Sequence, residues 1–347
     1  MIFKRVISCL VLGCAAIVAS AVIAQDDPDR GKTFYNNKTL RIVTGYPPGS
    51  TFDRYARSLG RHMGNHIAGK PGIIVQNMPG GGGLNAVAYV ANVAPKDGLT
   101  LALSNPQMAT APLLEPKSAA FDPRQFAWIG AISDDFTVCA FWSADLKTPA
   151  DLKRREIIVG ATGAAGGSAI DGRMLNALFG YRFKIVTGYP GMIEVRLAAE
   201  RGELDGQCGL PASTIKVDLQ EAVKSGKVYL GLQLGLRSAP DYPAVPNPAA
   251  QTDSDDIKNI VRLAYAPLAF MRPVLAPGGV APERIAELRR AFMTTMADAE
   301  FLREMETQKL DVRPVSPQTI AALVAELYAT PPEVVARTRQ MLGLEGR

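Results

Sequence analysis

The sequence predicts an α/β protein built as two lobes, and three observations carry this prediction. The chain has 347 residues, more than a single compact core usually serves. Segments with the spacing of strands and of helices alternate along it, which is typical of a parallel sheet covered by helices. Turns rich in glycine or hydroxyl residues follow several of these strands. The composition, with 47% hydrophobic and 20% charged residues, is that of a globular protein.

Residues 1–24 have the pattern of a secretory signal peptide. Lys4 and Arg5 form a short positive region, an apolar stretch covers residues 6–23, and small residues precede a cleavage site near Ala24. The apolar stretch, about 18 residues long, also has the length of a membrane anchor. Its alanine and cysteine content and its direct run into the cleavage site favour removal instead. We therefore expect an exported, soluble mature protein.

Charge and cysteine content limit the possible functions. Loss of Lys4 and Arg5 lowers the formal net charge from +5 to +3 (5 − 2), and such a small excess does not favour nucleic-acid binding. Cys14 has a weak similarity to a lipid-modified cysteine, although apolar residues continue beyond it. Cys139 and Cys208 remain after cleavage, either as a disulfide, which would contribute several kcal/mol, or as two buried thiols.

The first half of the mature chain reads as alternating strands and helices. A helix with Asp53 in its first turn follows the turn at residues 45–49, and its apolar residues recur at helical spacing. A second helix follows four consecutive glycines. Strands are predicted at residues 40–44, 73–75 and 99–103.

The second half repeats this plan. Ser168 and Asp171 have the spacing of a capping box and predict the start of a helix. Residues 193–201 form a second predicted helix, and the tail from Pro282 onward is helical. Strands are predicted at residues 156–161, 183–187, 204–208 and 228–234.

A six-residue sequence, Ile-Val-Thr-Gly-Tyr-Pro, occurs at residues 42–47 and again at residues 185–190. Both copies lie at the end of a predicted strand, which favours two similar lobes with matching loops. The flanking residues match poorly, so chance convergence on a strand-and-turn sequence is the alternative.

Catalytic and cofactor motifs are incomplete throughout the chain. Residues 64–71 nearly fit a phosphate-binding P-loop, but Pro71 replaces the hydroxyl residue that holds magnesium. The glycines do not have the spacing of a dinucleotide-binding fingerprint. His62 and His66, the only histidines, are spaced as in zinc sites, but Met63 stands where H-E-x-x-H has glutamate. No G-x-S-x-G elbow is present. We therefore expect neither catalysis, nor a cofactor, nor a metal.

The turns after the strands favour anion binding instead. In parallel α/β sheets these turns gather at the carboxyl ends of the strands, where ligands bind. Helix N-termini at that edge present free N–H groups to a carboxylate or phosphate. A micromolar ligand needs about 8 kcal/mol, so several such contacts from both lobes must converge in a cleft. The alternative is that the glycines only permit tight turns.

Four segments together resemble the substrate-binding receptors of tripartite tricarboxylate transporters, known as the TctC or Bug family. Residues 40–57 resemble the opening strand, Pro-Pro-Gly turn and Asp-bearing helix of that family. Residues 77–83 resemble its Asn-x-Pro-Gly-Gly-Gly loop, residues 94–100 its Ala-x-x-Asp-Gly-Tyr-Thr element, and residues 275–282 its Ala-Pro-x-Gly-x-Pro stretch. The resemblance covers nearly all of the mature chain.

The resemblance implies a type II periplasmic binding protein, with two Rossmann-like lobes, a hinge and an interlobe cleft. Residues 25–140 and 268–347 would form lobe 1, and residues 141–267 lobe 2. The protein would be a periplasmic monomer that binds a small organic acid and delivers it to membrane transport subunits. An exported sensor for a signalling membrane protein and, less in keeping with the missing catalytic groups, an exported enzyme on the same fold are the alternatives.

Carried over position by position, the resemblance also implies ligand-binding residues. The family usually has Gly-Gly-Thr after Pro-Pro, where this chain has Gly49 followed by Ser50, Thr51 and Phe52, so the pocket would be narrower with an apolar wall. The ligand can therefore differ from citrate. The candidate residues are Tyr46, Ser50, Thr51, Phe52, Asp53, Gly81, Gly82, Ser104, Asn105, Thr162, Gly166, Gly167, Ser168 and Asp205.

Overall fold

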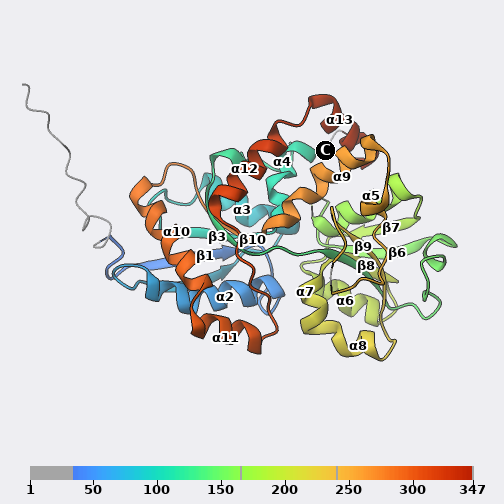
Figure 1. Cartoon of the computed structure of the whole chain (residues 1–347), viewed down its shortest axis with the longest axis horizontal. Coiled ribbons are helices and arrows are strands. Elements are labelled where there is room, and N and C mark those ends of the chain that lie inside the picture. Colours follow the sequence, from blue (N-terminus) through green and yellow to red (C-terminus); the bar gives the residue numbers. More distant parts are fainter. Residues whose placement is uncertain (1–33, 165, 240, 346–347) are drawn as a thin grey trace, which may run out of the picture.

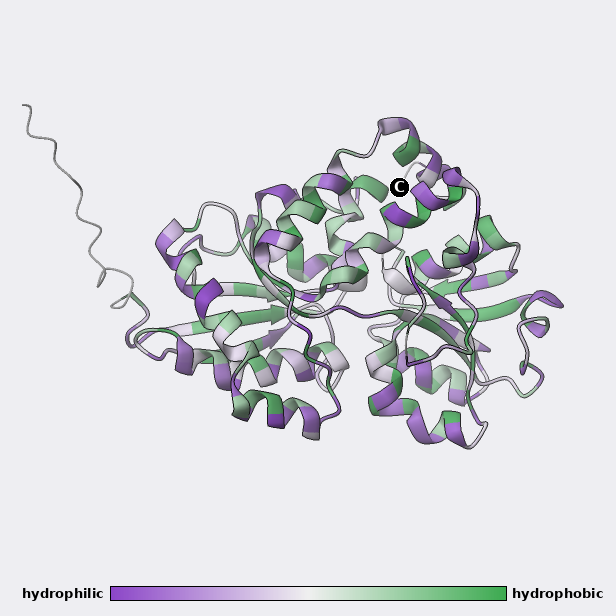
Figure 2. Ribbon diagram, in the orientation of Figure 1, coloured by the Kyte–Doolittle hydropathy of each residue, from purple (hydrophilic) through white to green (hydrophobic). Residues whose placement is uncertain are grey.

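The computed structural model describes residues 34–164, 166–239 and 241–345, so the predicted signal peptide lies outside the described residues. Two lobes lie side by side, each with a mixed sheet of five strands between helices (Figure 1). The strands are largely hydrophobic and the helices alternate between hydrophobic and hydrophilic residues (Figure 2), as expected for helices that cover a sheet. No helix in the described ranges is long and apolar enough to cross a membrane.

The first sheet has the strand order β2-β1-β3-β10-β4. The strands β1, β2 and β3 run parallel, and β10 pairs antiparallel with both β3 and β4. Their bounds are β1 Thr39–Thr44, β2 Gly72–Asn77, β3 Thr100–Leu103, β4 Ala127–Ser133 and β10 Met271–Ala276. The helices of this lobe are α2 Thr51–Met63, α3 Leu84–Asn92, α4 Ala111–Leu114, α10 Pro282–Met296, α11 Ala299–Thr307 and α12 Pro317–Tyr328.

The second sheet repeats this arrangement with the order β7-β6-β8-β5-β9. Here β6, β7 and β8 are parallel, and β5 takes the antiparallel place that β10 has in the first sheet. Its strands are β5 Thr137–Phe141, β6 Ile157–Ala161, β7 Phe183–Thr187, β8 Gly206–Pro211 and β9 Tyr229–Leu234. Its helices are α5 Gly167–Phe179, α6 Met192–Glu200, α7 Ala212–Thr214, α8 Gln220–Lys224 and α9 Asp255–Tyr265.

The chain passes between the lobes twice. The first connection, residues 134–136, leads from β4 directly into β5, and the second enters β10 through a short 3₁₀ segment, Ala266–Phe270. The expected boundary at residue 140 lies inside β5, whose hydrogen bonds to β8 and β9 hold it in the second sheet. The last helix, α13 (Pro332–Met341), contacts α4 as well as α5 and α9, so it packs on both lobes.

The strands predicted from the sequence correspond to β1, β2, β3, β6, β7, β8 and β9. The repeated hexapeptide does not mark equivalent loops, because its first copy ends β1, an inner strand, and its second copy ends β7, an edge strand. In the second sheet β7 occupies the place of β2. The lobes are alike in topology, but this repeat is not the cause of their likeness.

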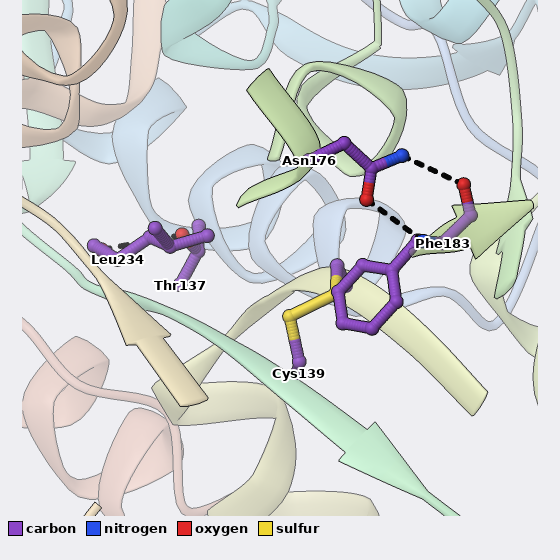
Figure 3. The surroundings of a disulfide bond; sticks show 6 residues. Thr137, Cys139, Asn176, Phe183 and Leu234 are labelled. Carbon is purple, nitrogen blue, oxygen red and sulfur yellow. Dashed lines mark hydrogen bonds between the residues drawn. A yellow bond between two sulfur atoms is a disulfide. The ribbon is translucent and has the colours of Figure 1, made fainter. Parts of the chain in front are cut away.

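A disulfide joins Cys139 of β5 to Cys208 of β8 (Figure 3). It links the strand by which the chain enters the second lobe to a strand from the middle of that sheet. Nearby, the Asn176 side chain of α5 donates to the Phe183 carbonyl oxygen at 2.8 Å and accepts from the Phe183 N–H at 2.7 Å (Figure 3). These two bonds hold α5 against the start of β7.

Candidate functional site

A cavity lies between the lobes at the carboxyl ends of the parallel strands. It contains about 840 Å³ of space free of atoms, including its opening to solvent, which is the scale of small-molecule sites. The loops after β1 and β3 reach it from the first lobe, and the loops after β6 and β8 from the second. This is the edge of an α/β sheet at which ligands are expected.

Most of the candidate residues line this cavity. The turn at the start of α2 and the start of α5 supply the majority of them. The candidates that line it are Tyr46, Ser50, Thr51, Phe52, Asn105, Thr162, Gly167 and Ser168.

The N-terminus of α5 presents uncapped backbone N–H groups to the cavity. The N-cap residue is Gly166, which has no side chain to accept hydrogen bonds from the first turn. Ser168 therefore lies inside the helix, and the expected capping box with Asp171 is wrong. A 13-residue helix carries partial positive charge at its start, and Gly167 and Ser168 line the cavity there. An anion is the ligand that such a terminus favours.

The N-terminus of α2 enters the cavity from the other lobe. Ser50 is its N-cap and accepts a hydrogen bond from the Asp53 N–H at 3.2 Å, while Thr51 and Phe52 line the cavity. Asp53 does not line it. Its carboxylate accepts hydrogen bonds from Arg57 at 2.9 Å and Asn77 at 2.7 Å. Burial raises the pKa of Asp53, but these hydrogen bonds outweigh burial and hold that pKa below its usual value.

The glycine-rich loop, residues 80–83, holds two residues of the cavity wall in place through hydrogen bonds. The Gly82 carbonyl oxygen accepts hydrogen bonds from the Tyr46 hydroxyl at 3.1 Å and from the Asn105 amide at 2.8 Å. Asn105 also donates to the Tyr46 oxygen at 2.7 Å. Burial, opposed by this hydrogen bond, raises the pKa of Tyr46 to about 12, so its phenol stays neutral. Tyr46 then stacks on Phe52, with ring centroids 4.4 Å apart. Gly82 thus positions two lining residues, and neither Gly81 nor Gly82 lines the cavity.

Gln207 is the most informative residue that sequence reasoning missed. It is fully buried in β8, lines the cavity, and neither atom of its amide has a hydrogen-bond partner in the described part of the chain. Buried polar groups without partners are costly, so native structures usually satisfy them. A ligand or water in the cavity would supply those partners. No motif marks Gln207, because it lies inside an apolar strand next to Cys208.

Arg196 and Asp218 are the charged residues of the lining, and neither belongs to a recognisable motif. Arg196 projects from α6, and Asp218 from a π-helical turn, Ile215–Leu219. Their closest N–O distance is 3.9 Å, and the Arg196 Nε lies 3.7 Å from Glu200. The Asp218 carboxylate lies 3.2 Å from the Arg54 guanidinium of the other lobe.

The two lobes touch each other around the cavity. The Thr214 hydroxyl donates to the Thr51 hydroxyl oxygen at 3.1 Å across the gap. At a second contact the backbones of the two lobes approach closely, since a Cβ added to Gly163 would lie 2.9 Å from the Gly81 carbonyl carbon. A Cβ on Gly82 would lie 3.0 Å from the Gly166 Cα. These glycines are therefore required where the lobes meet, in addition to any role in turns.

The structure places two other candidates away from the cavity. Asp205 lies before β8, at the amino edge of the sheet, where its carboxylate accepts from Arg155 at 2.8 Å and from the Ile158 N–H at 2.7 Å. Burial raises its pKa, but these bonds and that from the Ser143 hydroxyl lower it overall. Ser104 is buried and does not line the cavity.

The histidines have structural partners. His62 lies 2.8 Å from a Glu304 oxygen, and His66 lies 3.0 Å from an Asp298 oxygen. Both contacts join the end of α2 and the turn after it to the α11 region. Among the described residues there is no group of three or more side chains that could hold a metal ion.

No family model and no curated protein matches the sequence. Solved structures match it well. The periplasmic binding protein BugD has a TM-score of 0.70 at 21% identity, covering 90% of this chain and 99% of BugD. MatC from Rhodopseudomonas palustris, with bound malate, has a TM-score of 0.65 at 20% identity, covering 88% and 99%. Rpa4515 of R. palustris, with adipate, has a TM-score of 0.68 at 18% identity, covering 87% and 97%.

Each comparison spans both lobes, and at these identities each establishes a shared fold. The resemblance seen in the sequence motifs is confirmed at this level. The chain has the two-lobed α/β fold of the periplasmic binding proteins of the Bug and TctC type.

Proposed function

We propose that this protein is an exported solute-binding receptor of the Bug and TctC family, without catalytic activity, that captures a small carboxylate between its lobes. The observation that carries the proposal is the fully buried amide of Gln207, unpartnered in the described structure, in a cavity that two helix N-termini enter. The helix termini favour negative charge, and the amide requires a hydrogen-bonding group. A carboxylate supplies the negative charge and accepts a hydrogen bond from the Gln207 amide nitrogen, and a water bound beside it would donate to the amide oxygen.

Binding and closure are coupled in this proposal. A ligand that contacts Thr51 and Phe52 of one lobe and Gly167 and Ser168 of the other stabilises the arrangement in which the lobes touch. The two connections between the lobes act as the hinge. The closed form then delivers its ligand to the membrane subunits of a tripartite tricarboxylate-type transporter. Structures of the same fold with malate and with adipate support a carboxylate ligand.

The proposal is tested by ligand binding to mature protein that has been unfolded and refolded to remove bound host molecules. A thermal-shift screen of mono-, di- and tricarboxylates is expected to give a hit. Ligand at one hundred times its dissociation constant adds about 2.7 kcal/mol of stability, a shift of several degrees. If no carboxylate in the panel raises the melting temperature of the refolded protein, the proposal is contradicted.

A Gln207→Leu variant separates binding from folding. Leucine removes an unpartnered buried amide, so the free energy of unfolding without ligand should stay level or rise. Carboxylate affinity should fall by about tenfold or more, because the ligand loses a buried hydrogen bond. Gln318→Leu, exposed on α12, is the matched control and should bind as the wild type does. Unchanged affinity of Gln207→Leu would exclude Gln207 from the site.

A further inference from the structure

The cavity has a second polar end, distinct from the helix termini. Arg196 lies in α6 four residues after Met192 and three after Ile193, and all three line the cavity. Residues at this spacing share one face of a helix. Arg196 therefore stands beside apolar side chains, at the inner face of α6.

Arg196 reaches the cavity from the side of the second sheet opposite to α5. Val159 of β6 packs in the same apolar cluster as Met174 of α5, whereas the neighbouring Ile158 packs with Val195 of α6. Successive strand residues face opposite sides of a sheet, so α5 and α6 cover opposite faces, as Figure 1 shows. The uncapped turn of α5 and the Arg196 guanidinium thus approach the cavity from opposite directions.

The Arg196 guanidinium has unused hydrogen-bonding capacity. Its Nε is buried and has no hydrogen-bond partner among the described residues. Glu200 and Asp218 lie 3.7 and 3.9 Å from the guanidinium, which is close enough for weak ion pairs but too far for direct hydrogen bonds. Asp218 is already paired with Arg54 at 3.2 Å. A planar guanidinium in this state fits a carboxylate with two parallel hydrogen bonds.

We propose that Arg196 binds a second acidic group of the ligand, so that the cleft selects a diacid with an apolar spacer over a monoacid of equal length. This inference rests on the proposed function, because the first carboxylate occupies the helix termini. The spacer lies against the apolar side chains of the lining, including Phe52, Leu210 and Met271. Specificity then comes from the buried Arg196 Nε–H group, which a monoacid leaves without a hydrogen-bond partner.

The test is titration calorimetry with three probes of equal length, adipate, hexanoate and 6-aminohexanoate, on the refolded mature protein. Wild type should bind adipate about tenfold to a hundredfold more tightly than hexanoate. Arg196→Gln should remove most of that preference and leave hexanoate affinity within about twofold. Arg196→Lys keeps the positive charge but lacks the planar guanidinium that donates two parallel hydrogen bonds, so it should recover part of the preference for adipate. Arg201→Gln, at the exposed end of the same helix, is the matched control and should keep the full preference.

The outcomes distinguish this inference from the proposed function. Equal binding of adipate and hexanoate by the wild type, or an unchanged preference in Arg196→Gln, would overturn the role of Arg196 while leaving a carboxylate receptor. Tighter binding of 6-aminohexanoate would overturn it in favour of Asp218 as the residue that recognises the far end. If neither these three probes nor other carboxylates bind to wild type, the proposed function fails, and this inference fails with it.

Discussion

Arg272 and Asp135 form a fully buried ion pair across the two connections between the lobes. Their Nη1 and Oδ2 atoms lie 3.1 Å apart, and their side chains are 0% and 2% exposed. Asp135 belongs to the first connection, and Arg272 is the second residue of β10, the strand that follows the second connection. Ser213 of the second lobe donates to the same Asp135 oxygen at 2.6 Å and accepts from Arg272 at 2.6 Å. One charged network thus joins the first connection to the strand that follows the second connection.

Removing one charge from this network should destabilise the protein strongly. Asp135→Asn leaves Arg272 buried without its counter-charge, which costs about 3–5 kcal/mol of the free energy of unfolding. Denaturant unfolding, monitored by circular dichroism, measures this loss. Glu203→Gln, which breaks an exposed ion pair with Arg201, should leave the unfolding midpoint where it is. Equal midpoints for the two variants would contradict the structural role of the pair.

Closure of the lobes should depend on the absence of a side chain at Gly163. A Cβ there would lie 2.9 Å from both the Gly81 carbonyl carbon and the Gly82 nitrogen of the other lobe, so the backbones would have to separate. Gly163→Ala should therefore weaken carboxylate binding by about tenfold while each lobe stays folded. In solution scattering, the variant should fail to become more compact on addition of a ligand that compacts wild type.

Gly72→Ala is the control for that substitution. An added Cβ at Gly72 meets no atom within 4 Å. Its ligand affinity and its compaction should match those of the wild type. Wild-type compaction of Gly163→Ala would show that the lobes can close without the contact between residues 163 and 81.

A substitution at the uncapped start of α5 should weaken ligand binding without abolishing it. Ser168→Ala should weaken carboxylate binding by about 1 kcal/mol or more if the Ser168 hydroxyl contacts the ligand. The backbone N–H groups remain, so binding is weakened and not abolished. Calorimetry with the same carboxylate measures the change, and Ser225→Ala, at the exposed end of α8, provides the comparison. Unchanged affinity would mean that the Ser168 hydroxyl does not contribute to binding and that only its backbone N–H can contact the ligand.

The sequence predicts those parts of the site that local turn chemistry creates. Ser50 and Gly167 occur at strand-to-helix turns, and parallel strands bring such turns to one edge. Gln207 and Arg196 could not be found in this way. Gln207 is an isolated polar residue in a strand, and Arg196 cannot be distinguished by sequence from other arginines on surface helices. Only tertiary packing places both residues at the cavity. The expectation that Asp205 lies at the site assumed a loop at the carboxyl edge of the sheet, but the loop that carries Asp205 is at the amino edge.

The same distinction explains what was predicted of the fold. Short apolar strands followed by glycine-rich turns, such as β1 and β6, are visible from pattern alone. The antiparallel strands β5 and β10 are not visible in this way, because the strands they pair with lie far away in the chain, and only that pairing assigns each to its sheet. The position of residue 140 inside β5 follows from that non-local pairing.

The disulfide should contribute to the stability of the second lobe. Cys139 and Cys208 are 69 residues apart in the chain, so the bond closes a long loop in the unfolded state. Removing it should lower the free energy of unfolding by about 2–4 kcal/mol. Urea unfolding of wild type with and without a reductant measures the loss, and the double variant Cys139→Ala with Cys208→Ala should not respond to reductant. An unchanged wild-type midpoint under reducing conditions would contradict the prediction.

Asp171 should make the protein less stable as the pH rises toward neutrality. The residue is fully buried in α5, near Thr137, Tyr265 and the backbone of Gly209. Burial raises its pKa to about 7 from the ordinary value of 3.8, and the influence of these neighbours only partly opposes the shift. Between about pH 4 and pH 7 the unfolded chain therefore loses this proton while the folded protein keeps it. Each pH unit in that range lowers the free energy of unfolding by about 1.4 kcal/mol, for a total on the order of 4 kcal/mol.

Asp171→Asn isolates this effect, because asparagine resembles the protonated acid and does not titrate. The variant should match the wild type near pH 4 and become more stable than it as the pH approaches 7, after which the difference levels off. Asp53→Asn should show the opposite trend, since the pKa of Asp53 is lowered and its contribution is present at neutral pH and fades as the pH falls through that pKa. Urea unfolding of the three proteins at a series of pH values measures both differences. A difference between wild type and Asp171→Asn that does not change with pH would mean that Asp171 is already ionised in the folded protein at pH 4.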